Sequence, residues 1–244
     1  STVRGRITVG GRGSAAATLD AGAAGVVALH RGELNMADST STVRADLTEI
    51  ASPARLSGNG EVAGSLNVAG TIAPGNSIGT LTVTSNYTQT GPYEVEFRAP
   101  PVGRATGRHT LAGGGAASLA EQDADLINVS GTATLTGGTI VPVRLGTAAQ
   151  MNAALVASPT GQLRWLVLRA QGGLGGTRFV ALSNVAEVRI EYLNETDVEL
   201  VLASPVTGDG GGGGVPPPIL MPSAPPPALP ARDGTLRQWG LSQN

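Results

Sequence analysis

Two pairs of carboxylates have a spacing that could support acid–base chemistry. Glu94 and Glu96 are separated by one residue, as are Asp123 and Asp125, so each pair would face one side of an extended segment. Such pairs cleave glycosidic bonds only in a cleft with supporting basic or aromatic groups. Aromatic residues make up 3% of the chain, too few for the platform that sugars favour. We therefore expect solvated wall residues, and a carbohydrate-active enzyme is the less favoured alternative.

Other catalytic or ligand-binding patterns are weak. His30 and His109 lie far apart and have no acidic or second histidine partner at ligand spacing. The chain has no cysteine, and no serine occupies a G-x-S-x-G turn. The glycine-rich stretches at 58–60 and 172–176 lack the Lys-Ser/Thr pair of a phosphate-binding loop. We expect no enzyme activity, no cofactor and no metal ion.

The composition favours a narrow aliphatic core. The chain has 244 residues, of which 36 are glycine, and 41% are hydrophobic. This length fits one large or two small domains. Lysine is absent, the arginines are scattered and the net charge is −2, so nucleic acid is a poor candidate partner. No apolar run approaches the ~20 residues of a membrane-spanning helix.

The stretch from Gly58 to Phe97 organises the chain. Single apolar residues recur in it at short intervals, separated by Gly, Asn, Ser and Thr: Val62, Leu66, Val68, Ile72, Ile78, Leu81 and Val83. In the segment 73–76, Pro74 and Gly75 occupy the second and third positions that a type II turn favours. Short strands joined by such corners are typical of a parallel β-helix, in which each turn buries a few aliphatic side chains.

Residues 70–81 (GTIAPGNSIGTL), followed by 86–89 (NYTQ), resemble the passenger-associated motif of bacterial autotransporters, the type V secreted proteins of Gram-negative bacteria. Residues 125–135 (DLINVSGTATL) are similar to the second half of the same region. The resemblance covers roughly residues 50 to 205. The motif positions that carry it are Gly70, Pro74, Gly75, Asn76, Ser77, Gly79, Leu81, Tyr87, Asp125, Val129 and Gly131.

This resemblance implies the C-terminal part of a passenger domain, called the autochaperone region. Such a region promotes folding and translocation of the passenger and acts as a stalk or scaffold at the cell surface, or on a secreted protein. Its implied partner is an outer-membrane β-barrel translocator on the same or a separate chain. The absence of cysteine fits a chain that crosses a narrow pore largely unfolded.

One departure from the family pattern suggests an alternative function. The family passes quickly from a strand like 94–97 to a strand like 125–127, whereas here residues 98–122 intervene. An adhesin, or a subunit of a surface assembly, could bind a protein partner through loop 98–122 and the Pro-rich tail. Long insertions of this kind cost little extra closure entropy.

The predicted fold is all-β: a single-stranded right-handed parallel β-helix with a C-terminal antiparallel hairpin cap and a Pro/Gly-rich tail. We expect residues 1–57 to form turns of a longer solenoid and residues 58–204 to form the β-helix with its autochaperone-like region and cap. Residues 205–244 contain five consecutive glycines and a run rich in proline, so we expect a linker followed by a short docking segment.

Three further expectations concern local structure. Residues 187–192 and 197–202 alternate strictly and predict the hairpin, with an exposed charged face made by Glu187, Arg189, Glu191, Asp197 and Glu199. Residues 148–157 have helix-forming composition and could be a short helix or an irregular loop. Tyr87, Tyr93 and Phe97 are the one aromatic cluster, expected to pack in the core or cap, with a binding patch as the alternative.

Overall fold

The computed structural model describes residues 5–11, 16–101, 123–182, 187–203 and 205–206. The chain divides into two compact units, Ser1–Gly210 and Gly211–Asn244, and all described residues belong to the first. The predicted Gly/Pro-rich tail therefore lies outside the described residues except for Pro205 and Val206. Within the described part, no helix is long and apolar enough to cross a bilayer.

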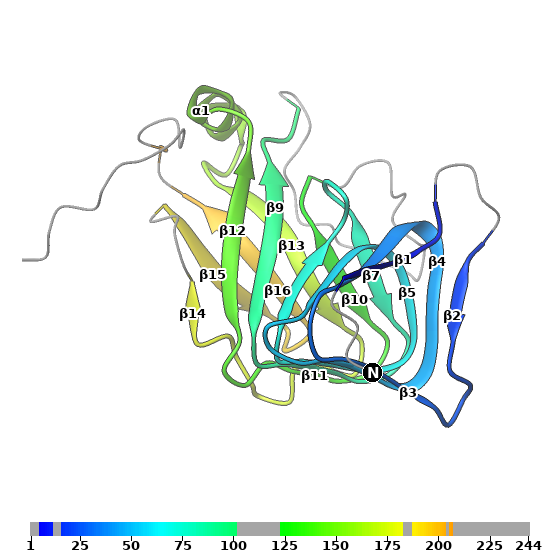
Figure 1. Cartoon of the computed structure of the whole chain (residues 1–244). Helices are drawn as coiled ribbons and strands as arrows, with labels where there is room; N and C mark the ends of the chain where they lie inside the picture. The colour runs from blue at the N-terminus through cyan, green and yellow to red at the C-terminus, as the bar shows by residue number, and fades with distance from the viewer. Residues whose placement is uncertain (1–4, 12–15, 102–122, 183–186, 204, 207–244) are drawn as a thin grey trace, which may run out of the picture. The chain divides into compact units, whose positions relative to one another are not determined.

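The described residues of the first unit form many strands and one helix. Its elements are β1 (Arg6–Val9), β2 (Thr18–Asp20), β3 (Val26–Leu29), β4 (Glu33–Ile50), β5 (Arg55–Val68), β6 (Thr71–Pro74), β7 (Thr80–Val83), β8 (Tyr87–Gln89), β9 (Pro92–Arg98), β10 (Leu126–Val129), β11 (Ala133–Thr134), β12 (Thr139–Leu145), α1 (Ala148–Ala157), β13 (Leu163–Ala170), β14 (Ala181–Leu182), β15 (Val188–Leu193) and β16 (Asp197–Leu202). All these strands belong to one curled sheet, and its strand pairs are parallel except at the C-terminal end (Figure 1). The prediction of an all-β chain is confirmed.

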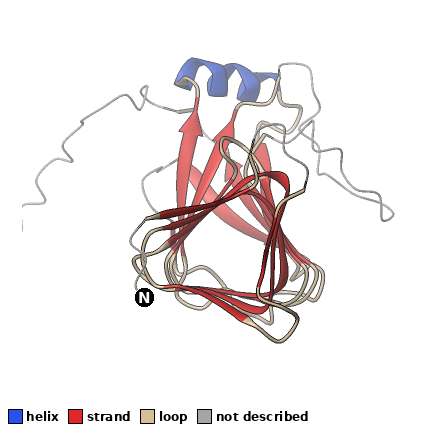
Figure 2. Ribbon diagram, turned by 45° about the vertical axis from the view of Figure 1, so that its right-hand side comes forward, coloured by secondary structure: helices blue, strands red, loops and turns tan. Residues whose placement is uncertain are grey.

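The parallel pairing places like residues above one another along the sheet. One ladder of directly paired positions joins Ile7, Leu34, Leu56, Ile72, Tyr93 and Ile140. A second joins Leu19, Val43, Val62, Val83, Val129 and Ala170. A third joins Val27, Thr48, Leu66, Tyr87 and Ala133. The strands lie along three sides of a common interior (Figure 2).

The aliphatic ladders explain why so few aromatic residues suffice for a core. Leu56, Val62, Leu66, Ile72 and Val129 are each 0% exposed. Each rung buries one or two aliphatic side chains, and its backbone groups pair with the strands on either side, as expected for stacked repeats. The interior is therefore filled by short side chains supplied at regular intervals by the sequence.

The corners differ from the prediction in one respect. The sequence suggests separate strands of three to five residues, but β4 and β5 run through two corners each without a break in pairing, apart from register shifts after Ala37 and Arg44. Gly58 allows one such bend, because its φ is +96° and a Cβ there would lie 1.9 Å from the Met36 carbonyl oxygen. Only glycine fits this combination of left-handed backbone and close approach.

The C-terminal end of the sheet changes to antiparallel pairing. β13 pairs in parallel with β10 and antiparallel with β16, which in turn pairs antiparallel with β15. The predicted hairpin is thus confirmed, and three residues, 194–196, connect its strands. Asn194 and Glu195 both have positive φ, and the Thr196 N–H donates to the Leu193 carbonyl at 3.1 Å. The segment 148–157 is a helix, α1, whose N-terminus has a capping box formed by Thr147 and Gln150.

Candidate functional site

The corner that follows β6 carries the first half of the motif, and Asn76 is its hub. The Asn76 side-chain amide donates to the backbone oxygens of Met36 and Ala37, at 3.2 and 3.1 Å. Its carbonyl oxygen accepts from Asn35 Nδ2 at 2.9 Å, and Asn35 Nδ2 also donates to Ser57. Asn76 therefore connects the corner to β4, although β5 lies between β4 and β6 in the sheet.

The turn at this corner lies later than predicted. β6 continues through Pro74, and the bend occupies residues 76–78 rather than 73–76. Gly75 does have the positive φ that was expected, +89°, and its N–H donates to the Gly58 carbonyl at 2.9 Å. Ser77 follows with a φ of +144°. The extra pairing of Gly75 with Gly58 keeps Pro74 in the strand and moves the bend towards Ser77.

Asp125 joins the two halves of the motif. Its Oδ1 accepts from the Gly79 N–H at 2.9 Å, and its Oδ2 accepts from the Glu96 N–H at 2.8 Å. Gly79 belongs to the first half of the motif and Asp125 to the second, 46 residues apart. The side chain of Asp125 thus ties the start of β7 to β9 at the point where β10 begins.

The same residue closes the base of the long excursion. Asp125 N–H donates to the Glu96 carbonyl at 2.8 Å, and Arg98 N–H donates to the Asp123 carbonyl at 2.9 Å. The side chains of Arg98 and Asp123 form an ion pair of 3.1 Å at the outer end of this pairing. We call residues 96–98 with 123–125 the neck. Residues 102–122, most of the excursion, lie outside the described residues.

The electrostatics of Asp125 are those of a buried carboxyl without a cation. The residue is 1% exposed, and within the described part its partners are backbone N–H groups rather than arginine. Burial raises the pKa of Asp125 to about 8, because the charged form loses hydration, while the two N–H donors lower the pKa and the Glu96 carboxylate raises it further. The neck therefore contains a group whose charge depends on pH near neutrality.

The remaining motif residues have packing roles. Leu81, Tyr87 and Val129 are 1%, 0% and 0% exposed and lie inside the sheet. At Gly79 a Cβ would lie 1.7 Å from Asn59 Oδ1, the acceptor for the Thr80 N–H. Gly70 and Gly131 lie where a Cβ would meet the backbone of the neighbouring strand connection.

The predicted aromatic cluster is core, as expected, but its members have separate partners. Phe97 packs edge-on against Trp165 with ring centroids 4.9 Å apart, and Tyr93 lies 6.2 Å from Phe179. The buried Tyr93 hydroxyl donates to the Val167 carbonyl at 2.6 Å, and Tyr87 is hydrogen-bonded to Gln89. The contact of Tyr93 links β9 to β13, whereas the contact of Tyr87 lies within β8. They were not predicted, because nothing in the local sequence identifies Val167 as the acceptor.

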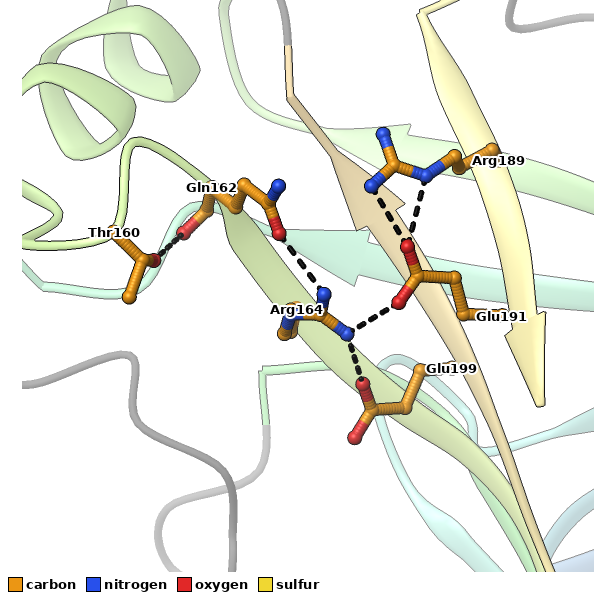
Figure 3. Close-up of polar contacts among 6 residues, drawn as sticks. All are labelled: Thr160, Gln162, Arg164, Arg189, Glu191 and Glu199. Atoms are coloured by element: carbon orange, nitrogen blue, oxygen red, sulfur yellow. Dashed lines mark hydrogen bonds and ion pairs between the residues drawn. The ribbon is translucent and has the colours of Figure 1, made fainter. Parts of the chain in front are cut away.

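A second polar cluster lies on the antiparallel end (Figure 3). Arg164 Nη1 contacts Glu191 Oε2 at 2.6 Å and Glu199 Oε2 at 3.0 Å, and Arg164 Nη2 donates to the side-chain oxygen of Gln162 at 2.9 Å. Arg189 binds the other oxygen of Glu191 at 2.7 Å. We call Gln162, Arg164, Arg189, Glu191 and Glu199 the arginine cluster.

The arginine cluster corrects the prediction of an exposed charged face. Glu199 is only 6% exposed, because β16 is a middle strand between β13 and β15 rather than an edge strand. Arg164, contributed by β13, neutralises it. Alternation within the hairpin placed these side chains on one face, but no local pattern indicates that β13 lies beside β16 and brings Arg164 to Glu199.

The carboxylates considered for catalysis have other contacts. Glu94 pairs with Arg55 at 2.6 Å, Asp123 pairs with Arg98, and Asp125 binds backbone N–H groups. His30 is exposed, and His109 lies outside the described residues. In the described part of the chain, no group of three or more His, Cys, Asp or Glu side chains could hold a metal ion.

No model of a known protein family matches the chain, and no curated protein matches its sequence. The candidate site therefore rests on geometry alone: a corner built on Asn76, a neck closed by Asp125, and an arginine cluster on the antiparallel end.

Proposed function

We propose that this chain is the C-terminal part of an autotransporter passenger, folded as a single-stranded right-handed parallel β-helix. Three ladders of paired aliphatic residues support the fold, because each strand connection returns the chain to the same three sides of the interior. The antiparallel strands β15 and β16 act as the cap, since they replace the parallel edge at that end with a closed hairpin.

The single observation that carries the functional proposal is the contact of Asp125 with Gly79. The two sequence pieces that resemble the passenger-associated motif are far apart in the chain, yet one side chain joins them at 2.9 Å. This cross-link stabilises one continuous block of coils from β6 to the hairpin. Such a block can fold first outside the outer membrane and provide a finished edge on which earlier coils assemble.

In this role the protein is not an enzyme. Its partner is an outer-membrane β-barrel translocator, and its location is the surface of a Gram-negative bacterium or the secreted fraction. Each coil laid on a finished one gains burial and backbone hydrogen bonds without closing a long loop. The energy of local folding then helps to draw the passenger outward.

A secretion assay tests this proposal. Residues 58–204 are placed between a reporter passenger and a translocator barrel, and surface exposure of the reporter is measured by its accessibility to external protease. We expect Asp125→Ala to lower the folded, surface-exposed fraction severalfold, while Val156→Ala, at a side chain that is 87% exposed, has no effect. Equal export with and without residues 58–204 would reject the role.

The neck favours a second candidate function, a binding module. Because residues 96–98 and 123–125 pair with each other, the excursion between them is attached to the wall at a closed base. An arm attached in this way could contact a host or assembly protein without straining the coils. Replacing residues 99–122 by Asn-Gly should preserve the melting temperature and abolish binding to cells or partner proteins; unchanged binding would reject the arm as the contact.

A further inference from the structure

The last described residue of the chain, Val206, is held by helix α1. The Val206 N–H donates to Asn152 Oδ1 at 2.7 Å, and Asn152 Nδ2 donates to the Val206 carbonyl oxygen at 3.1 Å. One side-chain amide thus satisfies both backbone groups of a single residue, as a neighbouring strand would. We call this pair of hydrogen bonds the exit clasp.

The exit clasp lies on a firmly packed base. α1 follows β12 and lies beyond its C-terminal end (Figure 1). Met151, Ala154 and Leu155, on the same helix as Asn152, are 0%, 3% and 7% exposed, so the helix is anchored in the core. The side chain of Val206 is itself 7% exposed and belongs to the same core.

The exit clasp lies shortly after β16, where it can protect the end of that strand. β16 ends at Leu202, only four residues before Val206, and pairs with β13 and β15. Chain ends fray unless they are tied down. A pull on the chain beyond Val206 that acted directly on Leu202 would separate β16 from its neighbours one hydrogen bond at a time.

We propose that Asn152 is a positioning residue that fastens the chain four residues after β16, so that tension applied beyond Val206 is carried by α1 and the core instead of by β16. The exit clasp stands on the contacts given above and does not depend on the proposed function. A role in resisting tension rests on the proposed function, in which the passenger is drawn outward as it folds.

Substitutions at Asn152 separate the exit clasp from general helix stability. Asn152→Ala removes both hydrogen bonds while raising intrinsic helix propensity, so weaker protection of Val206 cannot come from a weaker helix. Asn152→Asp keeps the acceptor for the Val206 N–H but places a carboxylate against the Val206 carbonyl. Ala153→Asn is the matched control, because it puts the same amide one residue away on the exposed side of α1.

Amide hydrogen exchange of the full chain, followed residue by residue by NMR, tests the exit clasp itself. We expect Asn152→Ala to speed exchange at Val206 by about 5- to 100-fold, the range for two net hydrogen bonds, and exchange at Leu202 by a smaller factor. Asn152→Asp should give an intermediate effect at Val206, and Ala153→Asn should leave exchange at Val206 unchanged. The Leu81 amide, far from α1 in the sequence, should exchange at the same rate in all variants. Unprotected Val206 in the unmodified chain, or unchanged exchange in Asn152→Ala, would overturn the proposal.

Pulling single molecules through a handle attached after Val206 tests whether the exit clasp carries tension. Asn152→Ala should lower the force of the first unfolding event, and Ala153→Asn should leave it unchanged. If Asn152→Ala speeds amide exchange at Val206 but leaves the unfolding force unchanged, the exit clasp exists but does not carry tension. Neither result depends on export, so the failure of this inference and the failure of the secretion assay are distinguishable.

Discussion

The parallel and the antiparallel parts of this sheet are stabilised in different ways. In the parallel part, neutral side chains such as Asn35, Ser57 and Asn76 satisfy backbone and side-chain groups at the corners, around ladders of buried and mostly aliphatic residues. At the antiparallel end, arginines pair with carboxylates, as in Arg164 with Glu199 and Arg169 with Asp197. The parallel part also contains ion pairs, such as Arg55 with Glu94, but neutral groups hold the corner at Asn76. At the antiparallel end, arginine–carboxylate contacts join the three neighbouring strands β13, β15 and β16.

The comparison predicts that a charge inside the coils is not tolerated. Val129 is 0% exposed and paired on both sides, with Val83 and Ala170. Val129→Asp would bury a charge without a partner, and we expect loss of several kcal/mol, enough to prevent folding of the isolated chain. Circular dichroism should show lost strand content. A spectrum and melting curve like those of the unmodified chain would contradict the account, and Thr82→Asp on the outer side is the control.

Asp125 sharpens the comparison, because it is a buried acid within the coil region. Its pKa is raised to about 8 from a usual value of 3.8, so the folded form binds a proton that the unfolded form releases. Its contribution to stability is therefore full below about pH 4 and is lost as the pH rises towards 8. Urea unfolding at several pH values should show this decline.

Asp125→Asn should remove most of that pH dependence, because an amide cannot titrate, while also lowering stability by turning an N–H donor towards a backbone N–H. Asp123→Asn, which alters the exposed ion pair with Arg98, is the control and should keep the slope. A slope that is the same in Asp125→Asn and in the unmodified chain would show that other groups titrate.

The arginine cluster tests the other region. Arg164→Met leaves Glu199 buried without a cation, and we expect a loss of about 1 to 3 kcal/mol, discounted from the cost at a fully buried pair because Arg164 keeps 27% of its side-chain exposure. Arg189→Met should cost about 0.5 kcal/mol or less, since Arg189 is 49% exposed and contacts Glu191 alone within the cluster. Equal losses measured by urea unfolding would contradict the asymmetry.

Substitution of Thr48 should have the smallest effect on stability, and it should raise stability where the other substitutions lower it. Its hydroxyl is buried at 0% exposure and has no hydrogen-bond partner among the residues that the structure describes, in a ladder otherwise made of apolar side chains and Tyr87. Thr48→Val removes the unsatisfied hydroxyl at nearly constant volume and should stabilise the protein by about 1 kcal/mol. The partly exposed Thr82→Val is the control. A lower melting temperature for Thr48→Val would mean that the hydroxyl has a partner in solution.

The sequence predicted the strands better than the contacts that join them. Apolar residues at short intervals with Gly and Asn corners indicated the inner face from Val62 to Val83, and strict alternation placed the hairpin at 187–202 to within a residue. Both signals are local. The bend after Pro74 was misplaced because the pairing of Gly75 with Gly58 comes from a neighbouring strand.

The long-range polar contacts could not be predicted, because the sequence signals are local. Asp125 was identified as a motif residue, but its two N–H donors come from Gly79 and Glu96, and no local pattern relates these positions. Arg164 was not singled out at all, since an arginine in an apolar strand indicates only a surface position until β16 and β15 bring Glu199 and Glu191 beside it. Charge alternation in the hairpin was the one available signal.

Cysteine cross-linking tests the stacking of the coils most directly, since the chain has no cysteine of its own. Glu61 is paired with Thr82, and Thr82 with Asn128, on successive strands. Adjacent strands lie ~4.8 Å apart, which a disulfide can span. Two strands with a third between them are too far apart for a disulfide. Mild oxidation should cross-link Glu61→Cys/Thr82→Cys and Thr82→Cys/Asn128→Cys nearly completely and leave Glu61→Cys/Asn128→Cys free. Failure of both adjacent pairs, or equal cross-linking of all three, would contradict the stacked coils.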